Sequence, residues 1–273
     1  MISDLIITTY NRPDALEAVL LSLIDQTVQP NQVIIADDGS TNETHALIEK
    51  YKNILSVKLI HSWHEDNGFR AAESRNKALS LVKSDYVIIV DGDMVLENHF
   101  IEDHLSFAEK GFFLQGGRVL MTAKLSNAIL ENPSVKVNLG PFSSGIESRI
   151  EKKLTAFRSP ILGKFFAKTL NNRNKVRSCN MSFFYKDIIA VNGFNNKFVG
   201  WGREDSEFVE RLIHNGIQGK LVKFVALGYH LYHKEESRKA LLENDQLLHV
   251  TIENKLTWCD DGLSKYLGKD IKF

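Results

Sequence analysis

Residues 4–36 read DLIITTYNRPDALEAVLLSLIDQTVQPNQVIIA and decide the fold. Two short apolar runs, at residues 4–9 and 32–36, are rich in β-branched side chains, which favour β-strands. Between them, residues 13–25 are helix-like and begin at Pro13, a residue that suits the first turn of a helix. A strand, a helix and a second strand in this order predict part of a mainly parallel sheet.

The same alternation continues outward along the chain. Further strand-like runs lie at residues 57–61, 86–90 and 112–121, and helix-like stretches lie at residues 43–51, 71–82 and 98–110. The pattern is lost over residues 122–176 and returns with strands at 178–185 and 221–231, a helix at 205–215 and a polar helical tail from 237. This alternation predicts an α/β fold with a mainly parallel sheet flanked by helices. We expect one domain over residues 1–235, with halves at 1–120 and 121–235, and a helical tail at 236–273.

The overall composition excludes several classes of protein. The 34 basic and 34 acidic residues cancel, and the pI near 7.1 argues against a nucleic-acid-wrapping domain. No signal peptide or run long enough to span a membrane is visible, so we expect a cytoplasmic protein, with peripheral contact at the inner face of the plasma membrane left open. Cys179 and Cys259 lack the spacing of a zinc or redox site, so we expect reduced thiols that pack.

Ligands of such sheets bind beyond the carboxyl ends of the strands, so the residues after each strand carry the chemistry. Asp91-Gly92-Asp93 follows the run at residues 86–90 and offers two carboxylates suited to Mg²⁺ or Mn²⁺; the alternative is an acidic turn. Asp37 and Asp38 follow another strand, where they either bind a nucleotide or form a turn that caps the next helix.

Basic and aromatic residues follow other predicted elements. Arg70 and Arg75 flank the start of a helix, where they either pair with phosphate or lie on a solvated face. The segment GWGREDSE, residues 200–207, places Trp201 as a stacking platform for a sugar, with Glu204 and Asp205 in the first turn of a helix; the alternative is a helix cap with a core tryptophan. His230 and His233 end a late strand, where we expect metal ligands rather than structural histidines.

Together these motifs resemble a family 2 inverting glycosyltransferase with the GT-A (nucleotide-diphosphosugar transferase, Rossmann-like) fold. The resemblance covers residues 4–120 and 178–240, and its last motif is similar to that of β-1,4-galactosyltransferases and of bacterial chondroitin and hyaluronan-type synthases. It implies that residues 1–120 bind the nucleotide-sugar and residues 121–235 bind the acceptor.

The resemblance also implies roles for single residues. Donor-nucleotide contacts fall to Thr9, Tyr10, Arg12, Asp37, Asp38, Arg70, Arg75, Asp91 and Gly92. Acceptor contacts fall to Trp201, Gly202 and Glu204, and catalysis falls to Asp205 as general base together with Glu204. Metal contacts fall to Asp91, Asp93, His230 and His233, with the choice between the two histidines left open.

The implied reaction is a metal-dependent, inverting transfer of a hexose or N-acetylhexosamine. A UDP-sugar would be the donor, a saccharide or lipid-linked saccharide would be the acceptor, and Mn²⁺ or Mg²⁺ would be the cofactor of the enzyme. The reaction would belong to the synthesis of a cell-surface polysaccharide or lipopolysaccharide. Three alternatives are a non-catalytic nucleotide-sugar or carbohydrate-binding module, a haloacid-dehalogenase-type phosphatase and a sugar-phosphate nucleotidyltransferase. The last would need a glycine-rich loop after the first strand, where the chain instead reads Thr8-Thr9-Tyr10-Asn11.

One segment carries a strong local charge. Residues 149–177 hold nine basic residues and one acidic residue, interleaved with apolar side chains. Such basic amphipathic stretches favour the interface of an anionic membrane, and a solvated loop or helix over the active site is the alternative.

Overall fold

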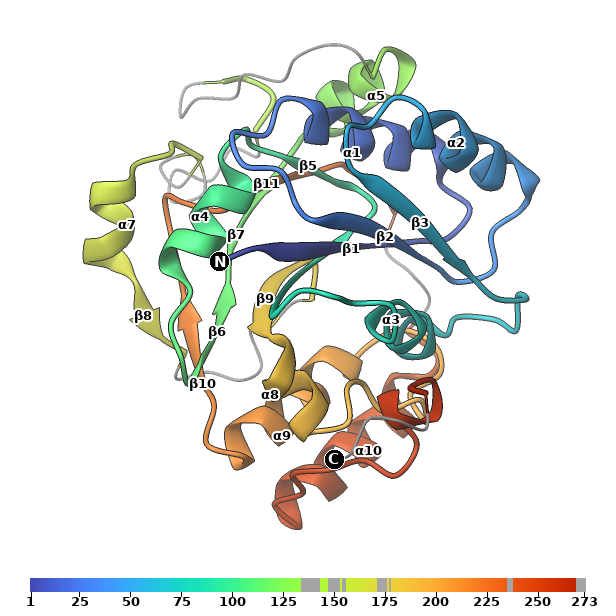
Figure 1. Cartoon of the computed structure of the whole chain (residues 1–273), viewed down its shortest axis with the longest axis vertical. Helices are drawn as coiled ribbons and strands as arrows, with labels where there is room; N and C mark the ends of the chain where they lie inside the picture. The colour runs from blue at the N-terminus through green and yellow to red at the C-terminus, as the bar shows by residue number, and fades with distance from the viewer. Residues whose placement is uncertain are drawn as a thin grey trace.

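The computed structural model confirms the predicted α/β architecture. It describes residues 1–133, 143–146, 153, 156–170, 176, 178–234 and 238–268. The first half alternates strands and helices (Figure 1): β1 Ser3–Thr9, α1 Pro13–Ile24, β2 Gln32–Asp37, α2 Asn42–Lys52, β3 Lys58–Trp63, α3 Ala71–Leu79, β4 Tyr86–Asp91, β5 Met94–Leu96 and α4 Phe100–Phe107. The later elements are β6 Phe112–Gln115, β7 Gly117–Leu120, α5 Ala123–Glu131, α7 Pro160–Phe166, β8 Lys168–Thr169, β9 Asn180–Phe184, α8 Tyr185–Ala190, α9 Glu204–His214, β10 Gln218–Leu221, β11 Leu227–His230, α10 Leu241–Glu253 and a 3₁₀ turn at Leu263–Lys265.

The main sheet has the strand order β3-β2-β1-β4-β9-β6-β10-β8. Its first four strands are parallel, and β9 joins them antiparallel to both β4 and β6. The register pairs Thr9 with Asp37 and Thr8 with Asp91, so the carboxyl ends of β1, β2 and β4 lie level. The polar loops that follow these strands therefore meet at one edge of the sheet.

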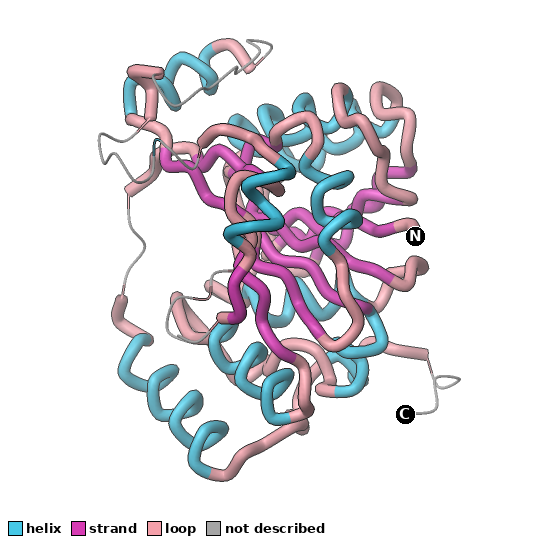
Figure 2. The backbone as a smooth tube through the Cα atoms, turned by 90° about the vertical axis from the view of Figure 1, so that its left-hand side faces the viewer, coloured by secondary structure: helices cyan, strands magenta, loops and turns pink. Residues whose placement is uncertain are grey.

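Helices cover both faces of this sheet (Figure 2). One apolar cluster joins the sheet to α1, α2 and α4, with Leu16 and Leu20 of α1 at its centre. The other cluster joins the opposite face to α3, α8 and α9, with Phe208 of α9 at its centre. Burial of both strand faces explains why the strands read as continuous apolar runs.

Two predicted strands are each divided in the structure. Residues 112–121 form β6 and β7. Of the strand predicted at 221–231, residue 221 is the last residue of β10 and residues 227–230 form β11, and the rest of β10, residues 218–220, was not predicted. Within each pair one strand joins the main sheet, and the other joins a small sheet of order β5-β11-β7. The division after β6 follows from Gly116, where a Cβ atom would lie 2.4 Å from Asn180 Oδ1. The register of the small sheet pairs His230 with Met94, the residue after Asp93. It therefore brings His230 close to Asp93.

A buried polar network lies where the two sheets meet. His104 Nε2 lies 2.8 Å from Asn180 Oδ1, and His104 Nδ1 lies 2.8 Å from Ser182 Oγ. Asn180 Nδ2 in turn donates to the carbonyl oxygens of Gly117 and Ala226. Burial lowers the pKa of His104 to about 4, so this imidazole is neutral at physiological pH.

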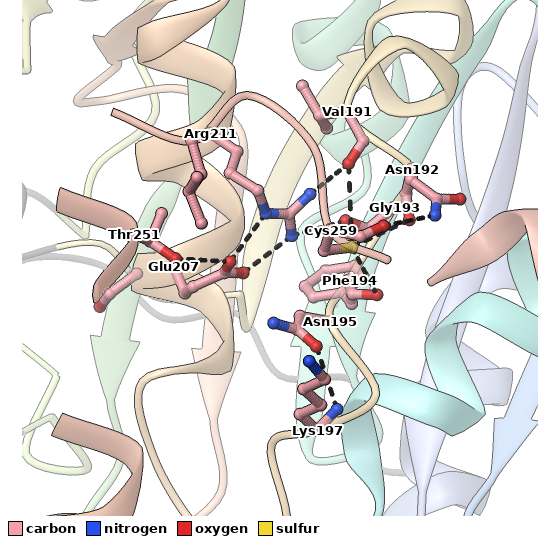
Figure 3. Close-up of polar contacts among 12 residues, drawn as sticks. Val191, Asn192, Gly193, Phe194, Asn195, Lys197, Glu207, Arg211, Thr251 and Cys259 are labelled. Atoms are coloured by element: carbon pink, nitrogen blue, oxygen red, sulfur yellow. Dashed lines mark hydrogen bonds and ion pairs between the residues drawn. The ribbon is translucent and has the colours of Figure 1, made fainter. Parts of the chain in front are cut away.

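A buried ion pair fixes α9 against its neighbours (Figure 3). Arg211 is fully buried, and its Nε and Nη2 atoms each lie 2.8 Å from a carboxylate oxygen of Glu207. The guanidinium group also donates to the carbonyl oxygens of Val191 and Gly193. Thr251 of α10 donates to Glu207 Oε1 at 3.1 Å, so one cluster joins α9 and α10 to the segment that follows α8. This cluster sets the position of α9, whose first turn carries Glu204 and Asp205.

The two cysteines are buried, and the described helices are short or polar. Cys179 and Cys259 are free, buried thiols, and burial raises the pKa of each to about 12. Their packing role is therefore as expected. Among the described residues, none of the helices has both the length and the apolar character needed to span a bilayer.

Candidate active site

The loops after β1, β2 and β3 interlock into one rim. Tyr10 of the first loop donates from its hydroxyl to Asp66 of the third at 2.9 Å. Asn11 N donates to Ser40 Oγ at 2.8 Å, which joins the first loop to the second. Gly39 has a φ of +97°, and a Cβ there would lie 2.5 Å from Asp66 Cα, so the close approach of the second and third loops requires glycine. The rim is thus fixed by side-chain and backbone contacts across three loops.

The two neighbouring aspartates of the second loop have different surroundings. Asp37 is fully buried, accepts from Ser40 N at 2.8 Å and lies 2.7 Å from His61 Nε2. Burial alone would favour its neutral form, but these hydrogen bonds hold the pKa of Asp37 below its usual value. Both carboxylate oxygens are engaged inside the protein. The geometry gives Asp37 a role in shaping the loop, and its expected contact with the nucleotide stays a prediction.

Asp38 lies nearer the rim and is held by two groups. Its Oδ2 accepts from Arg70 N at 2.8 Å, and its Oδ1 lies 3.2 Å from His64 Nε2. The contact with Asp38 raises the pKa of His64 even though burial opposes the charge. His64 belongs to the polar run after the third strand, but the sequence alone gave no reason to assign it a role. Arg70 contributes its backbone amide here, while its Nε turns to Asn67 O at 3.4 Å.

Arg75 connects two segments that lie far apart in the sequence, the end of β4 and the start of α9. This side chain is buried, with Nη1 at 3.0 Å from Glu204 Oε1 and Nη2 at 3.4 Å from Asp91 Oδ1. The guanidinium group also lies 5.3 Å from the ring of Phe194. The alternative of a solvated helix face is therefore excluded for Arg75. Asp91 Oδ1 accepts a further hydrogen bond from Thr8 Oγ1 at 2.9 Å, which fixes the carboxylate at the end of β4.

The two acids at the start of α9 lie on the other side of Arg75. Burial and the charge of Asp205 raise the pKa of Glu204, and Arg75 opposes this rise. Asp205 Oδ2 accepts from Ser178 N at 3.2 Å, and its Oδ1 accepts from Ser206 N at 2.7 Å. Glu204 is thus tied to the end of β4 through Arg75, while Asp205 is oriented by backbone amides.

The loop before α9 holds a tryptophan at the surface. Gly200, Gly202 and Arg203 all have positive φ angles, of 76°, 105° and 77°. Gly200 N donates to Phe69 O at 2.9 Å, which joins this loop to the segment before α3. Trp201 between the glycines is 39% exposed, and the guanidinium group of Arg238 lies 5.7 Å from the centre of its ring. The alternative of a core tryptophan is excluded.

Asp93, His230 and His233 form a group that could hold a cation. Asp93 Oδ2 lies 3.5 Å from His230 Nε2 and 3.1 Å from His233 Nε2, and the three potential ligand atoms lie within 4.8 Å of one another. Asp93 Oδ1 is buried and has no hydrogen-bond partner among the described residues. The contact with Asp93 raises the pKa of His233 to about 9, whereas burial lowers the pKa of His230. One carboxylate and two imidazoles are suitable ligands for a divalent transition-metal ion. Both histidines are brought to the group, and metal binding by each of them stays a prediction.

The structure separates the two carboxylates of the Asp-Gly-Asp motif. Asp91 is absent from the cation-binding group of described residues and belongs instead with Thr8 and Arg75. The turn between the carboxylates requires glycine, because a Cβ on Gly92 would lie 2.6 Å from Thr8 O. The expectation that Asp91 ligates the metal is therefore not supported by this geometry.

Two arginines influence the cation-binding group through their charge. Arg12 pairs with Asp14 at 3.0 Å, and its charge helps to lower the pKa of Asp93. The charge of Arg118 on β7 contributes to the lowered pKa of His230. Arg118 was missed because it lies inside the predicted strand at 112–121, and only the division of that strand shows which residues it faces.

Models of two known protein families match parts of this chain. The family model for glycosyl transferase family 2 matches residues 4–189, and the model for the N-terminal domain of galactosyltransferase matches residues 166–234. The first match covers more than half of the chain. A haloacid-dehalogenase-type phosphatase is excluded by it.

Similar curated proteins include two bacterial synthases. The hyaluronan synthase of Pasteurella multocida is 30% identical over 257 residues, covering 86% of this chain and 25% of that protein. The chondroitin synthase of Escherichia coli is 24% identical over 257 residues, covering 86% of this chain and 35% of that protein. The chain thus spans about a quarter to a third of the length of these relatives.

Solved structures show the same fold. TarS 1–349 of S. aureus in complex with UDP-GlcNAc has a TM-score of 0.62 and 19% identity, covering 97% of this chain and 69% of that one. The two family models together match residues 4–234, and the fold agrees with that of the solved structure. The chain therefore belongs to glycosyltransferase family 2.

Proposed function

We propose that this chain transfers a sugar from a UDP-sugar to a hydroxyl group of a saccharide acceptor and inverts the anomeric centre. The observation that carries the proposal is Arg75, which contacts Asp91 at the end of β4 and Glu204 at the start of α9. Arg75 therefore connects the Asp-Gly-Asp motif, which is expected to bind the donor, with the segment at residues 200–207, which is expected to bind the acceptor. The cation-binding group of Asp93, His230 and His233 contains the next carboxylate along the chain from Asp91.

The donor would bind along the rim of the first three loops. Thr9, Tyr10 and Asp38 would contact the nucleotide, with Arg12 on the diphosphate side. UDP is the preferred nucleotide because the structurally similar TarS has been solved with UDP and with UDP-GlcNAc. A divalent ion held by Asp93, His230 and His233 would supply positive charge to the diphosphate leaving group. The unpaired Asp93 Oδ1 supports this fit.

The acceptor would bind beside the exposed ring of Trp201. Sugars present apolar faces to such rings, and Gly202 allows close approach of the chain. Glu204 would orient the acceptor, and Asp205 would take the proton of the attacking hydroxyl group. A single displacement by this hydroxyl converts an α-linked donor sugar to a β-glycoside.

The names of the relatives indicate the chemical class of the donor and acceptor sugars. The matched proteins are named as hyaluronan and chondroitin synthases and as a poly(ribitol-phosphate) β-N-acetylglucosaminyltransferase. We therefore propose a hexose or N-acetylhexosamine donor and a saccharide or lipid-linked saccharide acceptor of a cell-surface polysaccharide.

The proposal is tested by measuring UDP release from UDP-glucose, UDP-galactose, UDP-N-acetylglucosamine and UDP-N-acetylgalactosamine. Reactions contain Mn²⁺ or Mg²⁺ and oligosaccharide acceptors. We expect one donor to be preferred and Asp205→Asn to abolish transfer, with UDP binding retained in calorimetry. Asp187→Asn is the matched control, because Asp187 also lies in the first turn of a helix but outside the site. Turnover that survives Asp205→Asn would refute the general base, and failure of every UDP-sugar to bind would refute the donor class.

A further inference from the structure

An exposed apolar surface surrounds α7, on the opposite edge of the molecule from α2 (Figure 1). Phe165 is 82% exposed and Ile161 is 70% exposed. Phe157 and Phe166 beside them are also exposed. Soluble proteins seldom expose contiguous apolar patches of this kind unless the patch contacts a partner. We call Phe157, Ile161, Lys164, Phe165, Phe166 and Lys168 the α7 surface.

The orientation of α7 is fixed by contacts on its other side. Ser159 N donates to Phe224 O at 2.7 Å, and Ser159 Oγ accepts from Leu162 N at 3.4 Å as the cap of the helix. Gly163 faces inward, where a Cβ would lie 2.8 Å from Val225 Cγ1. Because this side is packed, Ile161 and Phe165 are directed into solvent.

An ion pair anchors the chain just before α7. Arg158 Nε and Nη2 lie 3.0 Å and 2.7 Å from the two carboxylate oxygens of Asp103 on α4. Arg158 is thus used internally and does not belong to the basic surface predicted for residues 149–177. Arg149, Lys152, Arg173, Lys175 and Arg177 of that segment lie outside the described residues.

The charge of the α7 surface is positive. Lys164 and Lys168 are exposed and have no acidic side chain within ion-pair distance among the described residues. They flank Phe165, so cations border the apolar side chains. Aromatic and aliphatic side chains bordered by lysine are typical of segments that lie in the interface of an anionic bilayer.

We propose that the α7 surface docks this protein onto an anionic lipid bilayer. Ile161 and Phe165 would enter the boundary between headgroups and acyl chains, while Lys164 and Lys168 would contact acidic headgroups. A second copy of the chain fits less well, because its lysines would repel those of the first. A free anionic polymer fits less well, because it offers nothing apolar to Ile161 and Phe165. This proposal is independent of the transferase reaction proposed above.

The test is co-sedimentation of the full chain with vesicles of phosphatidylcholine alone or mixed with phosphatidylglycerol. We expect binding to the mixed vesicles only, and weaker binding at high salt. Phe165→Ser should weaken this binding about tenfold or more, and Lys164→Glu and Lys168→Glu should each weaken it about fivefold or more. Leu242→Ser is the matched apolar control, because Leu242 is 72% exposed on α10. Lys83→Glu is the matched charge control on an exposed loop.

Three results would overturn the proposal. One is no binding to mixed vesicles, and another is equal loss of binding in Leu242→Ser and Phe165→Ser. The third is a change from dimer to monomer on Phe165→Ser without vesicle binding, which would assign the surface to a second copy of the chain. UDP release, measured in parallel without vesicles, should be unchanged in Phe165→Ser. The two proposals therefore fail separately.

Discussion

Replacing Arg211 with methionine tests the buried cluster that positions α9. The change keeps a long apolar side chain but removes the charge opposite Glu207, whose two oxygens each lie 2.8 Å from the guanidinium group. Glu207 would then be a buried carboxylate with only the Thr251 hydroxyl as a described side-chain donor. Removing one partner of such a pair destabilises a protein by about 3–5 kcal/mol.

This loss converts to a measurable change in melting temperature. With an unfolding entropy of about 2.1 cal/mol/K per residue, the 273 residues imply a fall in Tm of about 5–9 °C for Arg211→Met. Differential scanning calorimetry measures this fall. Lys50→Met is the matched control, because Lys50 forms an exposed pair with Glu17 and should contribute less than about 1 kcal/mol.

A double variant separates loss of charge pairing from loss of packing. Arg211→Met combined with Glu207→Leu leaves no unpaired charge, so it should be more stable than Arg211→Met alone. The reasoning is refuted if Arg211→Met melts within about 2 °C of the wild type, or if the double variant gains nothing over the single one.

Three further predictions follow from the site and the core. Arg75→Met removes the positive charge between two carboxylates, so the rate of transfer measured by UDP release should fall about 100-fold or more, and an unchanged rate would contradict its bridging role. Chelation by EDTA should stop donor turnover and added Mn²⁺ should restore it, while His233→Ala should raise the Mn²⁺ concentration required by about tenfold or more. The pKa of His104 is about 4 in the folded protein, against an ordinary 6.5. The contribution of neutral His104 to the free energy of unfolding is therefore fully present above pH 6.5 and is lost as the pH falls toward 4, by about 3 kcal/mol in total. Between pH 7.5 and 5, urea unfolding should show about 2 kcal/mol of this loss in the wild type and a shallower slope in His104→Gln; equal slopes would contradict the assignment.

The sequence determined three strands of the first half of the fold almost to the residue, while helices α3 and α4 are shorter than predicted and β5 was not predicted. Strand-like runs at residues 4–9, 32–36 and 86–90 became β1, β2 and β4 with ends shifted by at most one residue. This worked because a buried parallel strand is a continuous apolar run, and each run is bounded by its own turn residues. The same reasoning placed the polar residues at the carboxyl ends of the strands.

The sequence was less informative where a strand changes partners. Residues 112–121 form an apolar run that is interrupted by Gln115, Gly116, Gly117 and Arg118. This interruption does not by itself show that β6 belongs to the main sheet and β7 to the small one. Gly116 marks that point only because Asn180, far along the chain, occupies the space of its Cβ. The division of the strand is thus a property of packing.

The candidate site shows the same distinction. Residue types and their spacing determined that Asp91, Asp93 and His230 belong to one end of the sheet. Only the tertiary structure decided that Asp93 faces both His230 and His233 while Asp91 pairs with Arg75. The physical reason is that local patterns set strand and helix positions, whereas the partner of a buried charge is set by which distant side chains are close enough to offset its desolvation.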